Sequence, residues 1–79
     1  MTLDQVPLHT AVTVSAVELE QAEQHRLTAL GLRQDTRVEV VRRAPFGGPL
    51  AVRVSGGGLL ALRRRQAEEV LVVEVGADA

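Results

Sequence analysis

Residues 36–54 read TRVEVVRRAPFGGPLAVRV, and this stretch predicts two strands joined by a tight turn. Val38 and Val40 alternate with charged residues, which places the valines in a core and the pair Arg42–Arg43 in solvent. The turn at residues 44–49 has two prolines and two adjacent glycines that are free to take positive φ. The last five residues resume the alternation. The stretch therefore predicts an antiparallel β-hairpin.

Three more segments outside this hairpin have the composition of short strands. They are residues 10–14, 59–62 and 70–75. A serine and three glycines turn the chain before residue 59, and residues 64–69 predict one helical turn with Ala67 as its buried residue. The strand at 59–62 or the strand at 70–75 is expected to be an exposed sheet edge, at which the chain could form a homodimer.

One helix is expected between the first strand and the hairpin, over about residues 17–30. Ser15 and Glu18 have the spacing of a capping box at its start, and Gly31 stands where a left-handed C-terminal cap favours glycine. The polar run before Leu27 is also typical of an exposed loop. In the helical interpretation, one apolar face is made by Leu19, Ala22, Leu27 and Leu30.

These elements favour a mainly β fold, a small and partly open five-stranded β-barrel. It has one inserted helix (about 17–30) and a short helical turn (about 64–69). A β-sandwich usually needs about 100 residues, whereas this chain has 79. A single domain is expected over residues 1–79, because so short a chain has no room for a second core.

The composition argues against an enzyme and against nucleic-acid binding. All nine basic residues are arginine, so Schiff-base lysines and the lysine of a phosphate-binding loop are absent. Without cysteine there is no thiolate nucleophile, disulfide or zinc ribbon. The net charge of −1 gives no electrostatic basis for binding nucleic acid. Phe46, the one aromatic residue, cannot by itself form a base-stacking platform or a groove for proline-rich peptides.

The sequence contains no recognisable export signal or membrane span. The N-terminus lacks the basic region and long apolar run of an export signal, and no uncharged run reaches the roughly 20 apolar residues of a membrane span. A cytoplasmic location is therefore expected.

Three sequence elements carry a resemblance to a known family. Arg26-Leu27-x-x-Leu30-Gly31-Leu32 is similar to the RLxxLGL element of the ferrous iron transport protein A (FeoA) family. Residues 38–49 resemble that family's strand and its APxGDP-type turn, and residues 60–64 (LALRR) resemble its LALR ending. The chain departs from the family at Gln34-Asp35, where Pro-Gly is usual, and at Gly48, where an acidic residue is usual.

The resemblance implies a cytoplasmic SH3-like domain that regulates or assembles FeoB, the membrane ferrous iron transporter with a cytosolic GTPase domain. Exposed loop residues are the expected docking surface, namely Arg42, Arg43, Phe46 and Arg63. The solvent side of the helix is a second candidate face. Phe46 is either folded over the barrel end as a core residue, which is favoured, or left in solvent as an anchor. Residues 63–65 are either a solvated turn balanced by Glu68 and Glu69 or part of the docking surface.

A second interpretation starts from the iron-dependent repressors, in which similar SH3-like domains occur at the C-terminus. In that case the chain is a metal-responsive accessory domain that binds a transition metal or another cytosolic protein. His9 and His25 are the only imidazoles and the weak candidates for ligands. Single histidines without a nearby partner ligand are usually solvated, so no metal site is expected. The glycine-rich segments are expected to form turns, because no Gly-Lys-Ser/Thr follows them.

Overall fold

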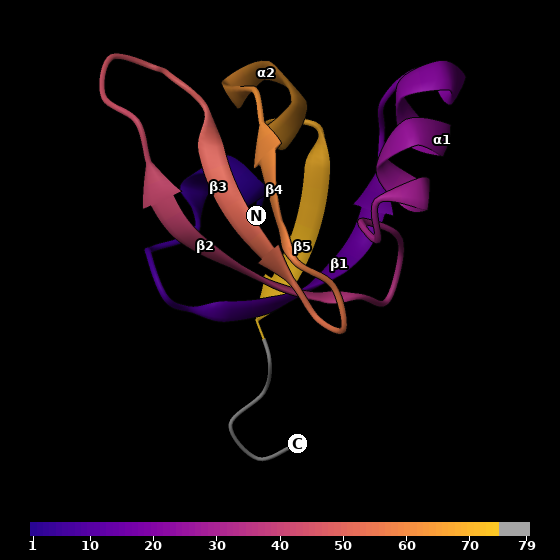
Figure 1. Cartoon of the computed structure of the whole chain (residues 1–79), viewed down its shortest axis with the longest axis horizontal. Helices are drawn as coiled ribbons and strands as arrows, with labels where there is room; N and C mark the ends of the chain where they lie inside the picture. Colours follow the sequence, from indigo (N-terminus) through magenta and orange to yellow (C-terminus); the bar gives the residue numbers. More distant parts are fainter. Residues whose placement is uncertain (75–79) are drawn as a thin grey trace.

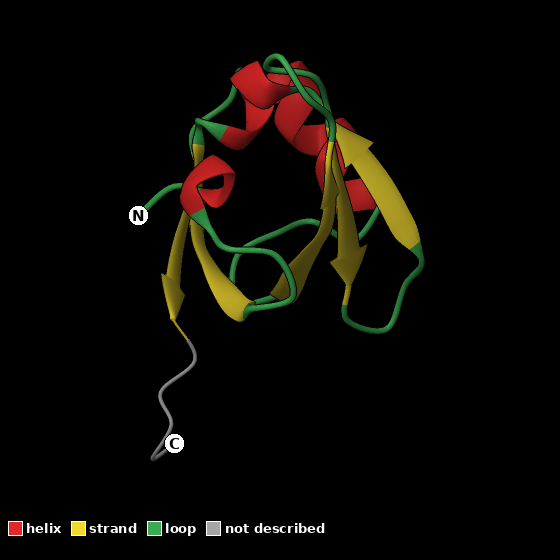
Figure 2. Cartoon of the chain, turned by 90° about the vertical axis from the view of Figure 1, so that its left-hand side faces the viewer, coloured by secondary structure: helices red, strands yellow, loops and turns green. Residues whose placement is uncertain are grey.

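Five antiparallel strands form one sheet in the order β4-β3-β2-β1-β5 in the computed structural model, which describes residues 1–74. The strands are β1 (Ala11–Val17), β2 (Arg37–Arg43), β3 (Leu50–Val54), β4 (Leu59–Leu62) and β5 (Val70–Glu74). A 3-10 helix η1 (Leu3–Gln5) and two helices, α1 (Gln21–Ala29) and α2 (Arg64–Ala67), complete the described chain. The sheet bends into a partly open barrel, because β4 and β5 are its two unjoined edges (Figure 2). The predicted mainly β fold is confirmed.

The barrel has two distinct ends. The β2–β3 turn, α1 and α2 lie at one end, shown at the top of Figure 1, and the β3–β4 turn lies at the other. Within residues 1–74, no helix combines the length and apolar character needed to cross a membrane.

The predicted strands largely agree with the structure. β3 and β4 have the expected bounds. β2 and β1 each begin one residue later than expected, and β1 extends three residues further, to Val17. The last predicted strand is described as far as Glu74, and Val75 lies outside the described residues.

The core is aliphatic, as a chain with one aromatic residue requires. Val38 and Val40 are buried as predicted. The other buried apolar side chains are Leu3, Val6, Val12, Val14, Leu27, Leu32, Leu50, Val52, Val54, Leu62, Ala67, Val70 and Val72. Gln66 is also buried, so the expectation that Ala67 alone is buried in the helical turn was wrong.

The start of α1 differs from the prediction, and the capping box at Ser15 does not form. Ser15 lies in β1, beside a register shift, and its Oγ donates a hydrogen bond to the Leu71 carbonyl at 3.2 Å. β1 continues because Val17 pairs with Val70, and the Glu18 N–H then bonds to the Glu69 carbonyl at 2.8 Å. Pairing with a strand more than 50 residues away thus replaces the local cap.

The end of α1 is as predicted. Gly31 has φ 101°, its N–H bonds to the Thr28 carbonyl at 3.0 Å, and the Leu32 N–H bonds to the Leu27 carbonyl at 2.8 Å. This is the paired pattern of a Schellman motif. The predicted apolar face is wrong in part, because Leu27 is buried whereas Leu30 is 52% exposed. The cap turns the chain at Leu30 and places Leu32 in the core instead.

Candidate docking surface

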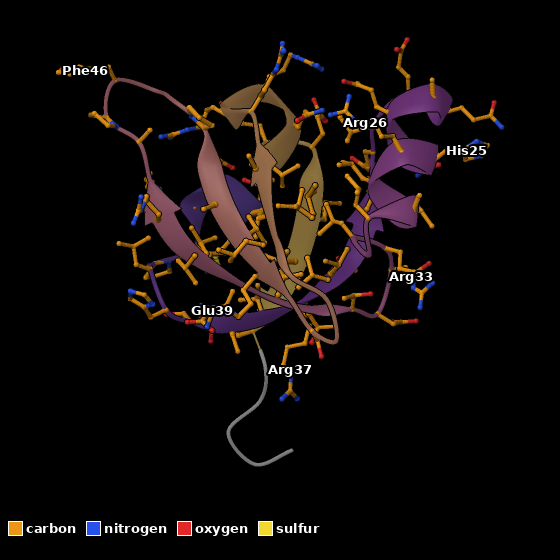
Figure 3. The ribbon with its side chains drawn as sticks, viewed as in Figure 1. His25, Arg26, Arg33, Arg37, Glu39 and Phe46 are labelled. Carbon is orange, nitrogen blue, oxygen red and sulfur yellow. The ribbon has the colours of Figure 1, made fainter. Side chains whose placement is uncertain are left out.

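Phe46 lies at the tip of the β2–β3 turn and points away from the barrel (Figure 3). Its side chain is fully exposed, so the favoured interpretation of Phe46 as a core residue was wrong. Backbone bonds alone close the turn: Ala44 N–H to the Pro49 carbonyl at 2.9 Å, and Gly48 N–H to the Pro45 carbonyl at 3.1 Å. The phenyl ring is therefore available to a partner.

The backbone at the tip of this turn has an unfavourable conformation at Phe46. Phe46 has φ 60° and Gly47 has φ 74°, whereas Gly48 is not left-handed. A left-handed conformation is unfavourable for a bulky side chain. Gly48 is required for a different reason, since a Cβ there would lie 2.8 Å from the Ala44 Cβ. Only one of the two glycines thus takes the positive φ that both were expected to be free to adopt.

Strand register brings Arg42 and Arg63 to the same end of the barrel as Phe46. Arg42 pairs with Ala51, and Ala51 pairs with Ala61, two residues before Arg63. A shallow hollow of about 150 Å³ lies here on the outer face, lined by Arg42, Ala44, Pro49, Leu50, Ala51 and Ala61. The hollow was not anticipated from the sequence, because β4 is apolar throughout and its sequence does not indicate which of its residues face outward.

Arg43 is placed differently from the other three predicted docking residues. Its guanidinium donates hydrogen bonds to the carbonyls of Asp4, at 3.2 Å, and Val6, at 2.6 Å. The side chain is partly buried, so the expectation that it points to solvent was wrong. Arg43 fastens the N-terminal segment to β2, a contact between residues too far apart for sequence periodicity to indicate.

Charge is segregated along the chain around this surface. Residues 40–67 contain six arginines and no aspartate or glutamate, and all ten acidic residues lie outside that range. Arg42 and Arg63 are exposed beside the hollow. The surface formed by Phe46, Arg42, Arg63 and the hollow, called here the hairpin surface, therefore has a local positive charge that the net charge of −1 conceals.

Arg63 and Arg65 lie in the same turn but make different contacts. The backbone N–H of Arg63 is capped by Gln66 Oε1 at 3.0 Å, which leaves the exposed Arg63 side chain at the hairpin surface. Arg65 instead donates two hydrogen bonds to Glu23 of α1, at 2.7 and 3.4 Å. The Arg65 guanidinium lowers the pKa of Glu23 below its ordinary value of 4.5, and Glu23 raises the pKa of Arg65. The ion-pair partner of this turn is thus Glu23, whereas Glu69, one of the two expected residues, has a weaker charge interaction with Arg65.

The two histidines lie apart from the hairpin surface. His9 Nδ1 is 3.3 Å from Glu39 Oε2, and its backbone N–H bonds to the Val40 carbonyl at 2.8 Å. His25 projects from α1 on the opposite side from Phe46 (Figure 3) and lines a hollow of about 340 Å³ with Arg33. Across residues 1–74, no group of three or more histidine, aspartate or glutamate side chains is placed to hold a metal ion.

The exposed face of α1, the second predicted surface, is polar. Leu27 is the one residue of α1 that is buried, and the Gln24 amide donates to the Val17 carbonyl at 2.6 Å. This face has no apolar anchor comparable to Phe46 apart from Leu30, which follows the helix. The hairpin surface is therefore the stronger candidate for a docking site.

Comparison with known proteins identifies the family. The model of the FeoA domain matches residues 1–74, whereas no curated protein sequence matches the chain. The solution structure of FeoA from Chlorobium tepidum is 34% identical, with a TM-score of 0.90 over 100% of this chain and 74% of that one. FeoA from Stenotrophomonas maltophilia, crystallised with zinc, is 38% identical, with a TM-score of 0.74 over 91% of this chain and 88% of that one.

The same fold occurs in a larger regulator. A manganese-dependent transcriptional repressor in complex with manganese is 22% identical, with a TM-score of 0.82 over 95% of this chain and 36% of that one, which shows the fold alone. The Stenotrophomonas protein is described as an SH3 domain protein that is a candidate ferrous iron transport activating factor. The left-handed Asp35, with φ 70°, fits the turn in which the family usually has Pro-Gly. This chain, with its SH3-like barrel, belongs to the FeoA-domain family.

Proposed function

We propose that this chain is a non-enzymatic cytoplasmic accessory protein of ferrous iron uptake that docks on the cytosolic side of a FeoB-type GTPase transporter. Membership of the FeoA-domain family supports the pathway. The observation that supports docking is Phe46, a fully exposed aromatic side chain in a left-handed conformation at the tip of a hairpin closed by backbone hydrogen bonds. Aromatic and arginine side chains are the residues most often found at binding hot spots.

The hairpin surface is suited to a partner with an apolar pocket and acidic surroundings. Phe46 supplies the anchor, and Arg42 and Arg63 supply guanidinium groups that pair well with carboxylates. Arg43 contributes indirectly in this proposal, by fixing the N-terminal segment behind β2. A small protein that binds one conformation of a transporter better than another shifts the population toward it.

A binding titration tests the proposal. The chain is titrated against its own organism's FeoB in detergent, with and without a GTP analogue and Fe²⁺. We expect saturable binding that changes with the nucleotide. Phe46→Ala and Arg63→Glu should each weaken binding at least about tenfold. The matched controls are Leu30→Ala and Arg33→Glu, at exposed positions elsewhere.

The absence of binding in every nucleotide and metal state would reject docking on FeoB. Equal weakening by the control variants would reject the hairpin surface as the docking site while leaving the interaction itself intact.

A second candidate function is a metal-responsive accessory domain. One observation favours it: His9 Nδ1 and Glu39 Oε2 lie 3.3 Å apart, so two ligand atoms of suitable chemistry face each other. The described hollow that His25 lines contains Arg33 and no carboxylate. A zinc titration followed by calorimetry tests the idea. Binding that is lost in His9→Ala and kept in His25→Ala supports a site at His9, and no change in either variant rejects it.

A further inference from the structure

The edge strand β4 is short, with four residues, but it lacks the other features that normally protect a sheet edge. Its sequence is LLAL, with no charge and no proline. Natural proteins usually protect an edge with charged residues, prolines, bulges or a covering segment. Leu59 is 60% exposed and Ala61 is also exposed, so the outer face of β4 is open to solvent.

The pattern of backbone bonds identifies which groups of β4 are unpaired. The Val54 N–H bonds to the Gly58 carbonyl at 3.2 Å, on the β4 side, and the Ser55 N–H bonds to the Arg37 carbonyl at 3.0 Å, on the β2 side. Because bonding direction alternates along a strand, even-numbered residues of β3 bond to β4. Their partners are Leu60 and Leu62.

The N–H and C=O groups of Leu59 and Ala61 therefore point away from β3. Among the described residues, no backbone hydrogen bond outside the β3–β4 ladder involves either residue. The next residue with an outward backbone N–H is Arg63, but that N–H is already bonded to the Gln66 side chain. Two donors and two acceptors thus form an open edge, next to the hollow that Ala61 lines.

The charges around this edge indicate what could occupy it. Arg53 lies directly across from Leu59 on the outer face, and Arg63 follows the strand at its other end. Residues 40–67 contribute no carboxylate to this edge, and the one described carboxylate directly across from Arg53 is that of Glu39 on β2, on the side away from β4. Antiparallel pairing with a second copy would bring the Arg53 and Arg63 side chains of two identical edges together, which is unfavourable.

We propose that β4 binds an extended acidic segment of a protein partner by strand addition. The backbone of the segment bonds to Leu59 and Ala61, its apolar side chains cover the exposed Leu59 and the hollow, and its carboxylates pair with Arg53 and Arg63. Main-chain bonds then supply affinity, and the arginines supply selectivity. This inference rests on the proposed docking function, and it names the chemistry of the segment that the hairpin surface would meet.

The experiment uses a short blocked peptide of sequence ETVTVTE as the probe, in which alternate positions place two glutamates and two valines on the same face of an added strand, and it follows amide hydrogen exchange by NMR. In the free chain, the amides of Leu59 and Ala61 should exchange quickly and those of Leu60 and Leu62 slowly. Saturating peptide should slow exchange at Leu59 and Ala61 at least about tenfold. The same peptide with lysine in place of glutamate should have no effect.

Two variants test the edge directly. Ala61→Pro removes one outward N–H without breaking a bond to β3, a position where an edge strand tolerates proline. Ala61→Glu keeps the N–H and adds repulsion, and Gln34→Glu is its matched control, with the same charge change at an exposed site on the α1 side. Peptide binding should be lost in both Ala61 variants and kept in the control.

The possible results distinguish strand addition at β4 from docking on FeoB. Unchanged exchange at Leu59 and Ala61 with peptide overturns the inference, as does slowed exchange in a concentration series of the chain alone, which would indicate pairing with a second copy. If FeoB binds and Ala61→Glu has no effect on it, the inference fails while the proposed function stands. If the peptide binds and FeoB does not, the edge stands and the proposed function fails.

Discussion

The two edges of the sheet are treated in opposite ways. At β5, the N-terminal segment covers the edge: the Val72 N–H bonds to the Met1 carbonyl at 2.9 Å, and Thr2 forms a bridge with Leu71. At β4, no described segment does the same. One edge is closed by the chain itself, and the other remains open beside the hairpin surface. The comparison shows that an open edge is not a general property of this sheet. It is specific to β4, because the chain's own N-terminal segment covers the edge at β5.

The largest expected effect comes from breaking the cover at β5. Leu3 is fully buried beneath it, so Leu3→Ala should lower the free energy of unfolding by about 2–5 kcal/mol. Leu59→Ala, on the open edge, should change it by less than about 0.5 kcal/mol. Denaturant unfolding of the two variants measures the contrast. Similar losses in both would mean that β4 is not an open edge.

The next effect tests the clamp that holds the cover in place. Arg43→Met removes the hydrogen bonds to the Asp4 and Val6 carbonyls, and we expect a loss of about 1–3 kcal/mol with faster amide exchange at Val72. Arg42→Met, the neighbouring exposed arginine, is the matched control and should be close to neutral. A loss as large at Arg42 would contradict the division of roles between the two residues.

A smaller effect of the opposite sign is expected at the tip of the hairpin surface. Phe46→Gly relieves the left-handed conformation at φ 60° but adds freedom to the unfolded chain, so stability should be unchanged or rise by up to about 1 kcal/mol. Binding to FeoB should fall at least about tenfold in the same variant. A clear loss of stability would show instead that the ring serves the fold.

The smallest effect concerns α2, which links the two edges and is fastened to α1 by Glu23 and Arg65. The pKa of Glu23 is lowered in the folded state, so this contribution is present above the ordinary pKa of 4.5 and is lost as the pH falls through the folded value. Glu23→Gln should therefore show a slightly smaller loss of stability than the natural chain between about pH 7 and pH 3. Thermal unfolding at the two pH values measures it, and an equal loss would contradict the pairing.

Much of the fold could be predicted because its signals are local. The alternation in residues 36–54, the turn residues around Gly47 and the glycine after α1 act within a few positions, and each was placed correctly. Less of the candidate docking surface could be predicted from local sequence signals. Arg42 and Arg63 were selected correctly as exposed residues, but their convergence on one hollow depends on the register of three strands.

The sequence by itself determined the strand segments, the aliphatic core and the FeoA resemblance, because periodicity and composition act through the chain's own neighbours. Only the tertiary structure decided where α1 begins, what Arg43 binds and which edge stays open. Each of these depends on a partner far away in the sequence: Leu71 and Glu69 for β1, the Asp4 and Val6 carbonyls for Arg43, and Met1 for β5. Buried backbone groups form hydrogen bonds with whichever partner the fold brings near them. The local sequence pattern does not indicate which distant residue that partner is.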